Sequence, residues 1–446
     1  MKIIIIGAGP GGYETALLAA KRGVEVVLVE AGHVGGTCLN EGCIPTKAFC
    51  KNAEVLDSLR EAETFGVTGL TYGFDFKAVA ARKNAVVEQL RGGVEGLLGH
   101  KLITLVRGKA SFKDVHTITV EGQDYVGDYI IIATGSVSAS LPIPGADLPG
   151  ILTSREILDL EDVPQSICVI GGGVIGLEFA SVFRSFGSEV TVLEYFKEIL
   201  PRFDSDLSKR LKQSLGKRGI EISTQTQVTA IEECDGKYKV AFSRKGKEEC
   251  VEADKVLMAV GRKANVDSLN LADVGIEFTP RGIVVDDKTM QTNFPHIYAV
   301  GDINGKMMLA HAATFQGIVA LDHIMGVEND IDLSVMPAAV FTSPEAACVG
   351  MTEEECKDAG IPVRCLKSFF RANGKAVTMG ETDGFCKIIV SDERILGCHL
   401  YGPHASDIIQ EACALITRKA TLKEFECIIH THPTLTEVLQ SAVHSL

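Results

Sequence analysis

Short apolar runs rich in β-branched residues recur along this chain, and glycine follows several of them. Residues 2–6 form the first run, which leads into the glycine-rich stretch 7–12 and then into an alanine- and leucine-rich segment at 15–20. A second apolar run, 24–29, ends on Glu30. Short apolar runs bounded by glycine are typical of strands buried on both faces. The pattern predicts a strand, a tight turn, a helix and a second strand.

The same pattern returns in the middle of the chain. Residues 167–170 are apolar, a glycine turn occupies 171–176, a helical pattern continues through 183, and the run 189–193 ends on Glu194. In both copies the acid follows the first glycine by 23 residues, since 30 − 7 and 194 − 171 are equal. This repetition predicts two equivalent nucleotide-binding units in one chain.

Other apolar runs predict how the rest of the chain is organised. Buried strands are expected within 128–135, 254–262 and 296–302, and from about residue 336 the pattern changes to hairpin strands at 385–390 and 395–400 with a helix at 406–418. The predicted fold class is α/β, with two Rossmann-like dinucleotide-binding domains and a separate α+β domain at the C-terminus.

The glycines of each copy are spaced as in turns that bind a dinucleotide. Gly-x-Gly-x-x-Gly between a strand and a helix allows a tight turn, a close approach to a pyrophosphate and close packing of helix on strand. The expected nucleotide-binding glycines are Gly7, Gly9 and Gly12 in the first copy and Gly171, Gly173 and Gly176 in the second. The acid that ends each second strand is placed to accept hydrogen bonds from an adenosine ribose.

Two cysteines, Cys38 and Cys43, lie directly after the first unit. In an ideal helix, Cα atoms five residues apart are roughly 8–9 Å from each other, whereas a disulfide needs about 4.4–6.8 Å. A bond between them therefore requires a distorted helix, which Gly42 and Pro45 favour. A thiol pair beside a bound redox cofactor is suited to passing two electrons between that cofactor and a disulfide.

The position of the thiols indicates which nucleotide binds where. The first unit precedes the thiols, so it is expected to bind a flavin, FAD, that exchanges electrons with sulfur. The second is then expected to bind a nicotinamide nucleotide. Glu194 favours NAD over NADP, because a carboxylate suits a free ribose hydroxyl and repels a 2′-phosphate. Lys197 and Arg202 follow this acid and are the nearby cations.

Composition narrows the range of partners. The 446 residues carry a net charge of −14 with no basic patch, so nucleic acid and anionic membrane surfaces are not expected as partners. No apolar run approaches the roughly 20 residues of a membrane-spanning helix. The 13 cysteines include no Cys-x-x-Cys pair and no His/Cys cluster with zinc spacing, so no metal is expected. Scattered thiols without an export signal favour a reducing cytoplasm.

In combination these motifs resemble the flavoprotein disulfide reductases over essentially the whole chain. Within that family, the sequence of residues 39–47 is most similar to that of the dihydrolipoamide dehydrogenases, and Glu194 favours the same branch. Further matching motifs lie at 133–135, 260–262, 298–302, 309–313, 341–345 and 430–437. Lys263 is a departure, because the family usually carries proline near this position.

The resemblance implies a role for each matching residue. Cys43 would be the thiol beside the flavin and Cys38 the thiol that meets substrate. His432 would be the acid–base, with Glu437 as its orienting partner, because imidazole exchanges protons near neutral pH. His430 is the weaker candidate for the base. The remaining implied residues are Lys47 paired with Glu178 near the flavin and nicotinamide, Asp302 at the ribityl or phosphate region, His311 and Ala312 at the flavin ring, and Thr134, Gly135 and Gly261 at the cofactors.

The resemblance also implies a division of the chain into domains and a partner. The expected domains are an FAD-binding domain at 1–143, an NAD-binding domain at 144–262, a second part of the FAD-binding or central domain at 263–335, and a C-terminal α+β interface or dimerisation domain at 336–446. In this family the base comes from the second subunit, so we expect an active homodimer. The expected function is oxidation of protein-bound dihydrolipoamide through a Cys38–Cys43 disulfide and FAD, with hydride passed to NAD. The lipoyl group would belong to carrier domains of 2-oxoacid dehydrogenase or glycine cleavage complexes.

Two alternatives remain at this stage. The first is an NAD(P)H-dependent reductase of another small disulfide, similar to glutathione reductase; Glu194 argues against its NADPH form. Mercuric reductase and the large thioredoxin reductases carry additional C-terminal thiols, whereas the last cysteine here, Cys427, precedes the base motif. The second alternative is a mainly structural subunit of a multienzyme assembly, against which the complete set of thiols and base argues.

Overall fold

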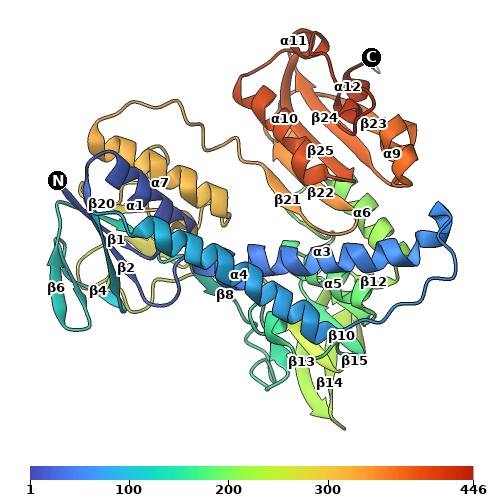
Figure 1. The fold of residues 1–446 in the computed structure, drawn as a ribbon, viewed down its shortest axis with the longest axis horizontal. Helices are drawn as coiled ribbons and strands as arrows, with labels where there is room; N and C mark the ends of the chain where they lie inside the picture. Colours follow the sequence, from blue (N-terminus) through green and yellow to red (C-terminus); the bar gives the residue numbers. More distant parts are fainter. Residues whose placement is uncertain (445–446) are drawn as a thin grey trace. The chain divides into compact units, whose positions relative to one another are not determined.

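The computed structural model describes residues 1–444 (Figure 1). Its residues form two compact units. The first contains 1–48, 77–139 and 261–333, and the second contains 49–76, 140–260 and the described residues from 334 onward. Among residues 1–444, no helix has both the length and the apolar character needed to cross a bilayer.

A five-stranded parallel sheet forms the centre of the first unit, in the order β20-β7-β1-β2-β3. Ile3 and Ile5 pack into the core on one face of this sheet, and Ile4 and Ile6 pack into a separate core on the other face. Burial on both faces explains why this strand is apolar at every position from Ile3 to Ile6 rather than alternating. The strands are β1 (Lys2–Ile6), β2 (Glu25–Glu30), β3 (Ile103–Arg107), β7 (Tyr129–Ile132) and β20 (Ile297–Ala299).

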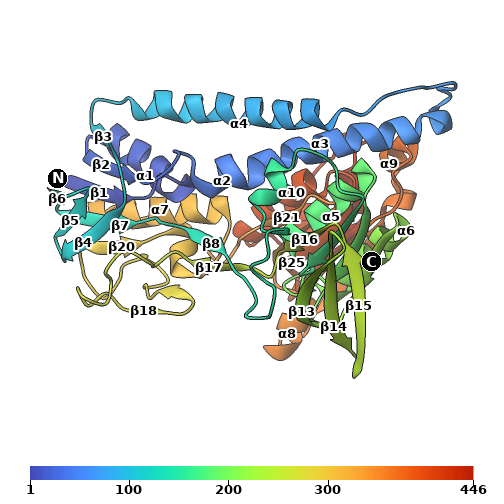
Figure 2. The ribbon, with the colours of Figure 1, turned by 90° about the horizontal axis from the view of Figure 1, so that it is seen from below.

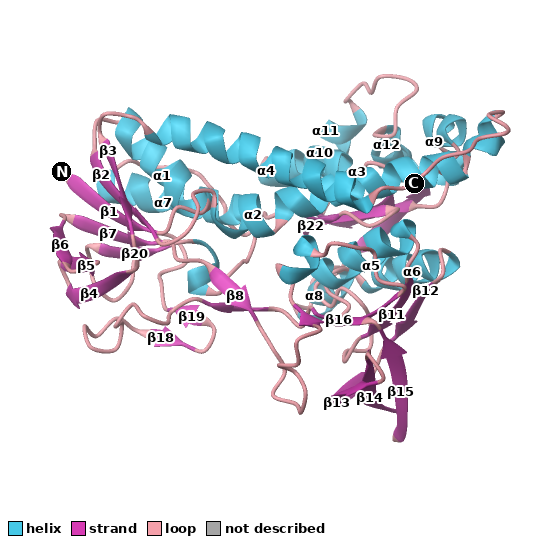
Figure 3. Cartoon of the chain, turned by 60° about the horizontal axis from the view of Figure 1, so that its bottom comes forward, coloured by secondary structure: helices cyan, strands magenta, loops and turns pink. Residues whose placement is uncertain are grey.

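Two helices of the first unit, α1 (Pro10–Lys21) and α7 (Ala310–Met325), lie side by side next to this sheet (Figure 3). Glycine allows their close approach, since a Cβ at Gly317 would lie 2.0 Å from Oγ1 of Thr15. The first unit also contains α2 (Gly36–Glu41), the start of α3 (Cys43–Arg60) and all of α4 (Phe76–Leu98) except its first residue. A short antiparallel sheet combines β4 (Ala110–Asp114), β5 (Thr117–Val120) and β6 (Gln123–Val126).

The second unit repeats this arrangement. Its parallel sheet has the order β12-β11-β10-β16-β9, so β10 takes the central place that β1 has in the first sheet. An antiparallel three-stranded sheet again precedes the returning strand, here β16 (Figure 2). The elements are β9 (Ile151–Leu152), β10 (Ser166–Ile170), α5 (Val174–Phe186), β11 (Glu189–Leu193), α6 (Ser205–Lys217), β12 (Ile220–Ser223), β13 (Thr226–Cys234), β14 (Lys237–Arg244), β15 (Lys247–Ala253) and β16 (Lys255–Met258).

The C-terminal part of the second unit is an antiparallel sheet with helices packed on it (Figure 1). Its strand order is β21-β22-β25-β24-β23, and β24 and β25 form the hairpin predicted from sequence. The elements are β21 (Ala338–Val340), β22 (Glu345–Gly350), α8 (Glu353–Asp358), β23 (Arg364–Phe369), α9 (Gly374–Met379), β24 (Phe385–Ser391), β25 (Arg394–Gly402), α10 (Ala405–Thr417), α11 (Leu422–Glu426) and α12 (Glu437–His444).

The predicted fold class is confirmed, and the differences from the sequence expectations are confined to the ends of elements. The first helix begins at Pro10 rather than near Thr15, because proline at the first helical position lets the helix start inside the glycine turn. The remaining short elements are β8 (Ser136–Ser138), β17 (Arg262–Ala264), β18 (Phe278–Thr279), β19 (Gly282–Ile283) and 3₁₀ turns at Ala62–Phe65, Glu156–Asp159, Gly301–Asn304 and Phe370–Ala372.

Candidate functional site

The first glycine turn can form only because side chains are absent from two of its positions. Gly7 has a φ of 104°, and a Cβ there would lie 2.3 Å from the carbonyl oxygen of Ala133. A Cβ at Gly12 would lie 1.8 Å from the carbonyl oxygen of Gly7. Gly9 precedes α1, and no side chain caps the N-terminus of this helix. The backbone amides of that turn are therefore available to an anion such as a pyrophosphate.

Glu30 connects the end of β2 to this turn. Its Oε2 accepts a hydrogen bond from the backbone N–H of Ala8 at 2.7 Å, and its Oε1 accepts one from Gly32 at 2.7 Å. Each carboxylate oxygen has a further lone pair. The carboxylate is thus oriented by the backbone and still able to accept hydrogen bonds from a ribose.

The second glycine turn reproduces the first in detail. Gly171 has a φ of 112°, and a Cβ there would lie 2.3 Å from the carbonyl oxygen of Ala259. A Cβ at Gly176 would lie 2.1 Å from the carbonyl oxygen of Gly171. Gly173 precedes α5 without a side-chain cap, and a Cβ at that position would meet open space. This turn can receive a second pyrophosphate in the same way.

Glu194 is held in the second copy as Glu30 is held in the first. Its Oε2 accepts from the backbone N–H of Gly172 at 2.5 Å and its Oε1 accepts from Phe196 at 2.6 Å. The side chain is buried. A buried carboxylate at the ribose position opposes a 2′-phosphate, which agrees with the expectation of NAD.

The helix that carries the two cysteines is broken between them. α2 ends at Glu41, Gly42 interrupts the helix, and α3 begins at Cys43, where the backbone N–H of Thr46 donates to the carbonyl of Gly42 at 3.1 Å. The break lies at the glycine that was expected to distort the helix. As a result the thiols of Cys38 and Cys43 are in hydrogen-bond contact.

The two thiols differ in environment. Cys38 is partly buried and Cys43 is exposed. The hydrogen bond with Cys43 and burial together raise the pKa of the Cys38 thiol well above its usual value, although the nearby Lys47 charge lowers it. Cys43 occupies the N-terminal end of α3, where the helix dipole favours negative charge. The hydrogen bond and burial therefore favour the protonated form of Cys38.

Asp302 lies at the end of the first sheet, in a network that sequence reasoning missed. Ser136 Oγ donates to Oδ2 of Asp302 at 2.5 Å, and Arg262 Nε donates to Ser136 Oγ at 2.7 Å. Burial lowers the pKa of the Arg262 guanidinium, whereas the charges of Asp302, Glu41 and Cys43 oppose that change. The network fixes the Asp302 carboxylate and places a cation within electrostatic reach of Cys43.

Other predicted cofactor residues also lie in the first unit. Thr134 Oγ1 donates to the carbonyl of Asn265 at 3.1 Å, and Gly135 and Gly261 have φ angles of 71° and 116°. His311 is exposed and Ala312 is buried in the first turn of α7, whose N-terminus also lacks a side-chain cap. Uncapped amides at this end are suited to an electron-rich ring.

His432 and Glu437 are brought together at the start of α12. His432 Nδ1 lies 2.9 Å from Glu437 Oε1, and the imidazole is 79% exposed. The other carboxylate oxygen accepts from the backbone N–H of Thr434 at 2.7 Å. These two interactions, that of Thr434 first, lower the pKa of Glu437. The ring of His432 is thereby oriented while its Nε2 faces outward.

Glu178 and Lys47 belong to different units. Glu178 is buried on α5 of the second unit, where its Oε1 accepts from the backbone N–H of Phe341 at 3.0 Å. Lys47 lies one turn after Cys43 in the first unit. Their pairing stays a prediction.

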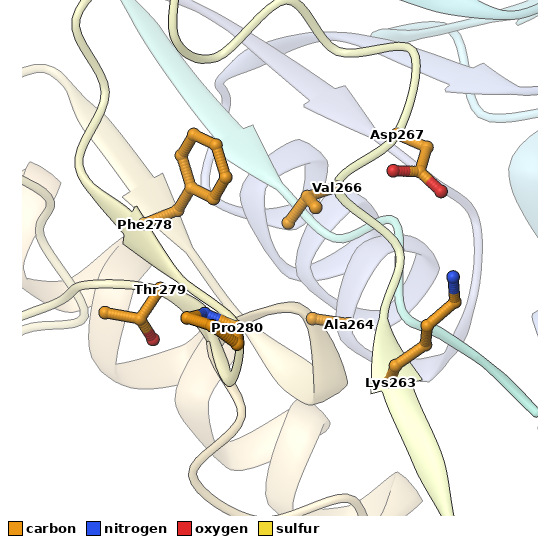
Figure 4. A pocket seen from close by; sticks show the side chains of 7 residues that line it. All are labelled: Lys263, Ala264, Val266, Asp267, Phe278, Thr279 and Pro280. Carbon is orange, nitrogen blue, oxygen red and sulfur yellow. The ribbon is translucent and has the colours of Figure 1, made fainter. Parts of the chain in front are cut away.

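A cavity of about 260 Å³ lies in the first unit. Lys263 and Asp267 line one side and Phe278, Thr279 and Pro280 the other (Figure 4). None of the predicted site residues lines it. Within residues 1–444, no three or more His, Cys, Asp or Glu side chains are grouped in a way that suits a metal ion.

Comparison with known proteins agrees with this geometry. Residues 1–317 match the family described as pyridine nucleotide-disulphide oxidoreductase, and residues 336–443 match its dimerisation domain. The dihydrolipoyl dehydrogenase of Chlamydia muridarum is 41% identical over 442 residues, covering 98% of this chain and 94% of that protein. The dihydrolipoyl dehydrogenase of Geobacillus stearothermophilus is 39% identical over 446 residues, again covering 98% and 94%.

Solved structures with the same fold include more than one kind of disulfide reductase. LpdA from Mycobacterium tuberculosis aligns with a TM-score of 0.92 at 26% identity, covering 100% of this chain and 99% of that one. The HOCl-induced flavoprotein disulfide reductase RclA from Escherichia coli aligns with a TM-score of 0.88 at 29% identity and the same coverage.

Proposed function

This chain belongs to the pyridine nucleotide-disulphide oxidoreductase family, and we propose that it is an NAD-dependent dihydrolipoyl dehydrogenase. The family uses FAD and NAD, and the chain is an oxidoreductase. The observation that carries the proposal is the helix break at Gly42, which brings Cys38 and Cys43 into contact directly after the first glycine unit. Identity of about 40% to proteins named dihydrolipoyl dehydrogenase supports the choice of substrate.

The proposed reaction begins from the disulfide form of Cys38 and Cys43. His432 removes a proton from one thiol of the dihydrolipoyl group, and the resulting thiolate attacks Cys38 Sγ. The Cys38–Cys43 bond breaks, a mixed disulfide forms at Cys38, and Cys43 leaves as the thiolate. The second substrate thiol then attacks the substrate sulfur of the mixed disulfide. This releases the lipoyl disulfide and leaves Cys38 and Cys43 reduced.

The glycine turns fit the two nucleotides, because each lacks the side chains that would fill it and each precedes an uncapped helix. FAD, when bound, supplies the two-electron acceptor between the thiols and NAD. Gly7, Gly9, Gly12 and Glu30 would hold FAD at its pyrophosphate and adenosine ribose, while Thr134, Gly135, Asp302, His311 and Ala312 would hold its remaining parts. Gly171, Gly173, Gly176, Glu194 and Gly261 would hold NAD. Lys47, paired with Glu178, would orient the reacting ends.

A homodimer is part of the proposal, with His432 and Glu437 of one copy serving the thiols of the other. The match of residues 336–443 to a dimerisation domain supports this. The dithiol would be carried by a lipoyl-bearing domain of a 2-oxoacid dehydrogenase or glycine cleavage complex, in the cytoplasm. The domain boundaries at 143, 262 and 335 belong to the same proposal.

The test is a comparison of substrates on purified, flavin-loaded protein. Dihydrolipoamide with NAD is expected to turn over strongly, whereas oxidised glutathione with NADH or NADPH is not. Cys38→Ser should abolish dithiol turnover while FAD stays bound, and Cys250→Ser, at an exposed thiol, should leave turnover unchanged. Reduction of glutathione disulfide in preference to lipoamide would instead favour the small-disulfide reductase.

A further inference from the structure

Asn40 lies on α2 between the two cysteines, two residues after Cys38 and three before Cys43. Its side chain is partly buried, and Nδ2 donates to two backbone carbonyls, that of Val34 at 3.0 Å and that of Gly36 at 2.8 Å. Both N–H groups of the amide are therefore used. None of the roles assigned above involves this side chain, so its hydrogen bonds require another explanation.

The two carbonyls that Asn40 binds lie on either side of Gly35, in the turn that leads into α2. This turn contacts the first glycine turn. The backbone N–H of Gly35 donates to the carbonyl of Ala8 at 2.7 Å, and a Cβ at Gly36 would lie 2.6 Å from Cα of Gly9. Gly35 and Gly36 have φ angles of 91° and 58°, which glycine adopts readily but only as some of many alternatives. Asn40 supplies contacts that select this conformation, and so it connects the thiol segment to the turn that is suited to a pyrophosphate.

Arg91 of α4 holds the Asn40 amide in this orientation. Arg91 Nε donates to Oδ1 of Asn40 at 2.8 Å, across 51 positions of sequence. If the amide were reversed, its NH₂ group would face the Arg91 N–H and its oxygen would face two carbonyl oxygens, so the three hydrogen bonds fit one orientation only. All of these residues lie in the first unit. Arg91 therefore connects α4 to the segment that carries the thiols.

We propose that Asn40 and Arg91 are positioning residues that hold α2 on the first glycine turn and Cys38 against Cys43. The inference rests on the proposed function for the role of the thiol pair in turnover. Neither side chain exchanges electrons or protons, and Arg91 acts on the thiols through Asn40. Because α2 is held in place, the two sulfurs meet more often than they would in a mobile segment, which favours closure of the disulfide. Loosening α2 should therefore make the Cys38–Cys43 bond easier to reduce.

The first test measures the equilibrium between the Cys38–Cys43 disulfide and its dithiol in the flavin-loaded protein, without lipoamide or a nicotinamide nucleotide. The protein is equilibrated with dithiothreitol and its cyclic disulfide, which exchange two electrons and two protons with the thiol pair. Alkylation and peptide mass spectrometry then give the oxidised fraction. We expect the equilibrium constant for forming the protein disulfide to fall about three- to tenfold in Arg91→Met, the effect of losing one hydrogen bond. The loss should be smaller in Arg91→Lys, which keeps an N–H donor.

The matched control is Lys77→Met, which removes an exposed cation from the same helix and should leave the constant unchanged. An unchanged constant in Arg91→Met would overturn this inference alone. Absence of a Cys38–Cys43 disulfide in the wild-type protein would overturn the proposed function together with it.

The second test asks whether Arg91 acts through Asn40, by measuring the same constant in Asn40→Ala and in the double variant. Asn40→Ala should lower the constant at least as far as Arg91→Met, because it removes all three hydrogen bonds. We expect Arg91→Met to have no further effect once Asn40 is absent. Asn40→Leu, which has a similar volume and no polar atoms, replaces Asn40→Ala if flavin absorbance shows that the alanine variant has lost FAD. A direct effect of the Arg91 charge on the thiols would persist without Asn40, so additive losses in the double variant would contradict the proposal.

Discussion

The carboxylate of Glu194 accepts a hydrogen bond from the backbone N–H of Gly172, 22 residues earlier in the chain. In the first unit Glu30 accepts from Ala8 across the same separation. Each acid also accepts from the backbone N–H two residues after itself. The repeat therefore extends to individual hydrogen bonds, and each acid connects the end of a strand to its own glycine turn.

Glu194→Gln is expected to weaken NAD binding. An amide has a single acceptor oxygen, so one of the two backbone N–H groups now bound by Glu194 would face an NH₂ group. The amide also lacks the negative charge, and a hydrogen bond from a ribose hydroxyl to a charged group contributes about 1.5–3 kcal/mol, so KM for NAD should rise by up to roughly 150-fold, with a smaller preference over NADP. Steady-state kinetics with both nucleotides checks this. Glu189→Gln, an exposed acid at the start of β11, is the control and should behave as wild type.

Gly12→Ala and Gly176→Ala should separate the two nucleotide sites. A Cβ at Gly12 would lie 1.8 Å from the carbonyl of Gly7, so the first turn must open and the protein should lose FAD. A Cβ at Gly176 would disturb the second turn in the same way, so this variant should stay yellow but bind NAD weakly. Flavin absorbance measures how much FAD each purified variant retains. Calorimetric titration with NAD measures its affinity for NAD.

The control for these variants is Gly92→Ala. Gly92 lies within α4, where a Cβ would meet open space. Alanine there should raise the free energy of unfolding by about 0.5–1 kcal/mol without changing the binding of FAD or NAD. Retention of FAD by Gly12→Ala would contradict the assignment of the first turn.

The interaction between Glu437 and His432 should be lost at low pH, when the Glu437 carboxylate becomes protonated. The Thr434 N–H and then His432 lower the pKa of Glu437 below its ordinary value of 4.5. Its stabilising contribution is therefore complete above pH 4.5 and is lost as the pH falls through the lowered value. Glu437→Gln should reduce kcat roughly 10- to 100-fold, because an amide cannot balance the imidazolium formed during turnover. The difference in melting temperature between wild type and variant should shrink from about pH 7 to about pH 3, and a constant difference would contradict this account.

Among the cations of the C-terminal sheet, we expect Lys387 to contribute most to the free energy of unfolding. It is buried, and its ammonium contacts Asp204, Asp206 and Glu353 at 2.9, 3.2 and 2.5 Å. Burial opposes its charge, but hydrogen bonds to Glu353 and Asp204 outweigh burial and raise the pKa of Lys387. The contribution is then complete below pH 10.5 and is lost only as the pH rises through the raised value.

Lys387→Met should lower the free energy of unfolding by about 3–5 kcal/mol at neutral pH, because it leaves the buried Asp204 unpaired. Lys51→Met breaks an exposed pair with Glu54 and should cost less than about 1 kcal/mol. Denaturant unfolding of both variants provides the comparison. If both variants lost the same free energy of unfolding, burial of the Lys387 ion pair would not explain its contribution to stability.

Local sequence patterns predicted much of this molecule. The glycine turns, their strands and the acids at 30 and 194 follow from short-range rules, as does the distortion at Gly42. The contacts of Arg262 with Ser136 and of Glu411 with His430 do not, because their partners are 126 and 19 residues apart in sequence. Only the folded chain brings them together, and a serine or a lone glutamate has no distinctive local signal. The start of the first helix was also misplaced, because proline is as common in turns as at the first helical position.

The central claim is that Cys38 and Cys43 form the disulfide that exchanges electrons with NAD. The most direct measurement adds one equivalent of NADH to oxidised, flavin-loaded protein without oxygen, followed by alkylation and peptide mass spectrometry. The account predicts two new alkylated thiols, located at Cys38 and Cys43. No new thiols, or new thiols at other cysteines with these two unchanged, would contradict it.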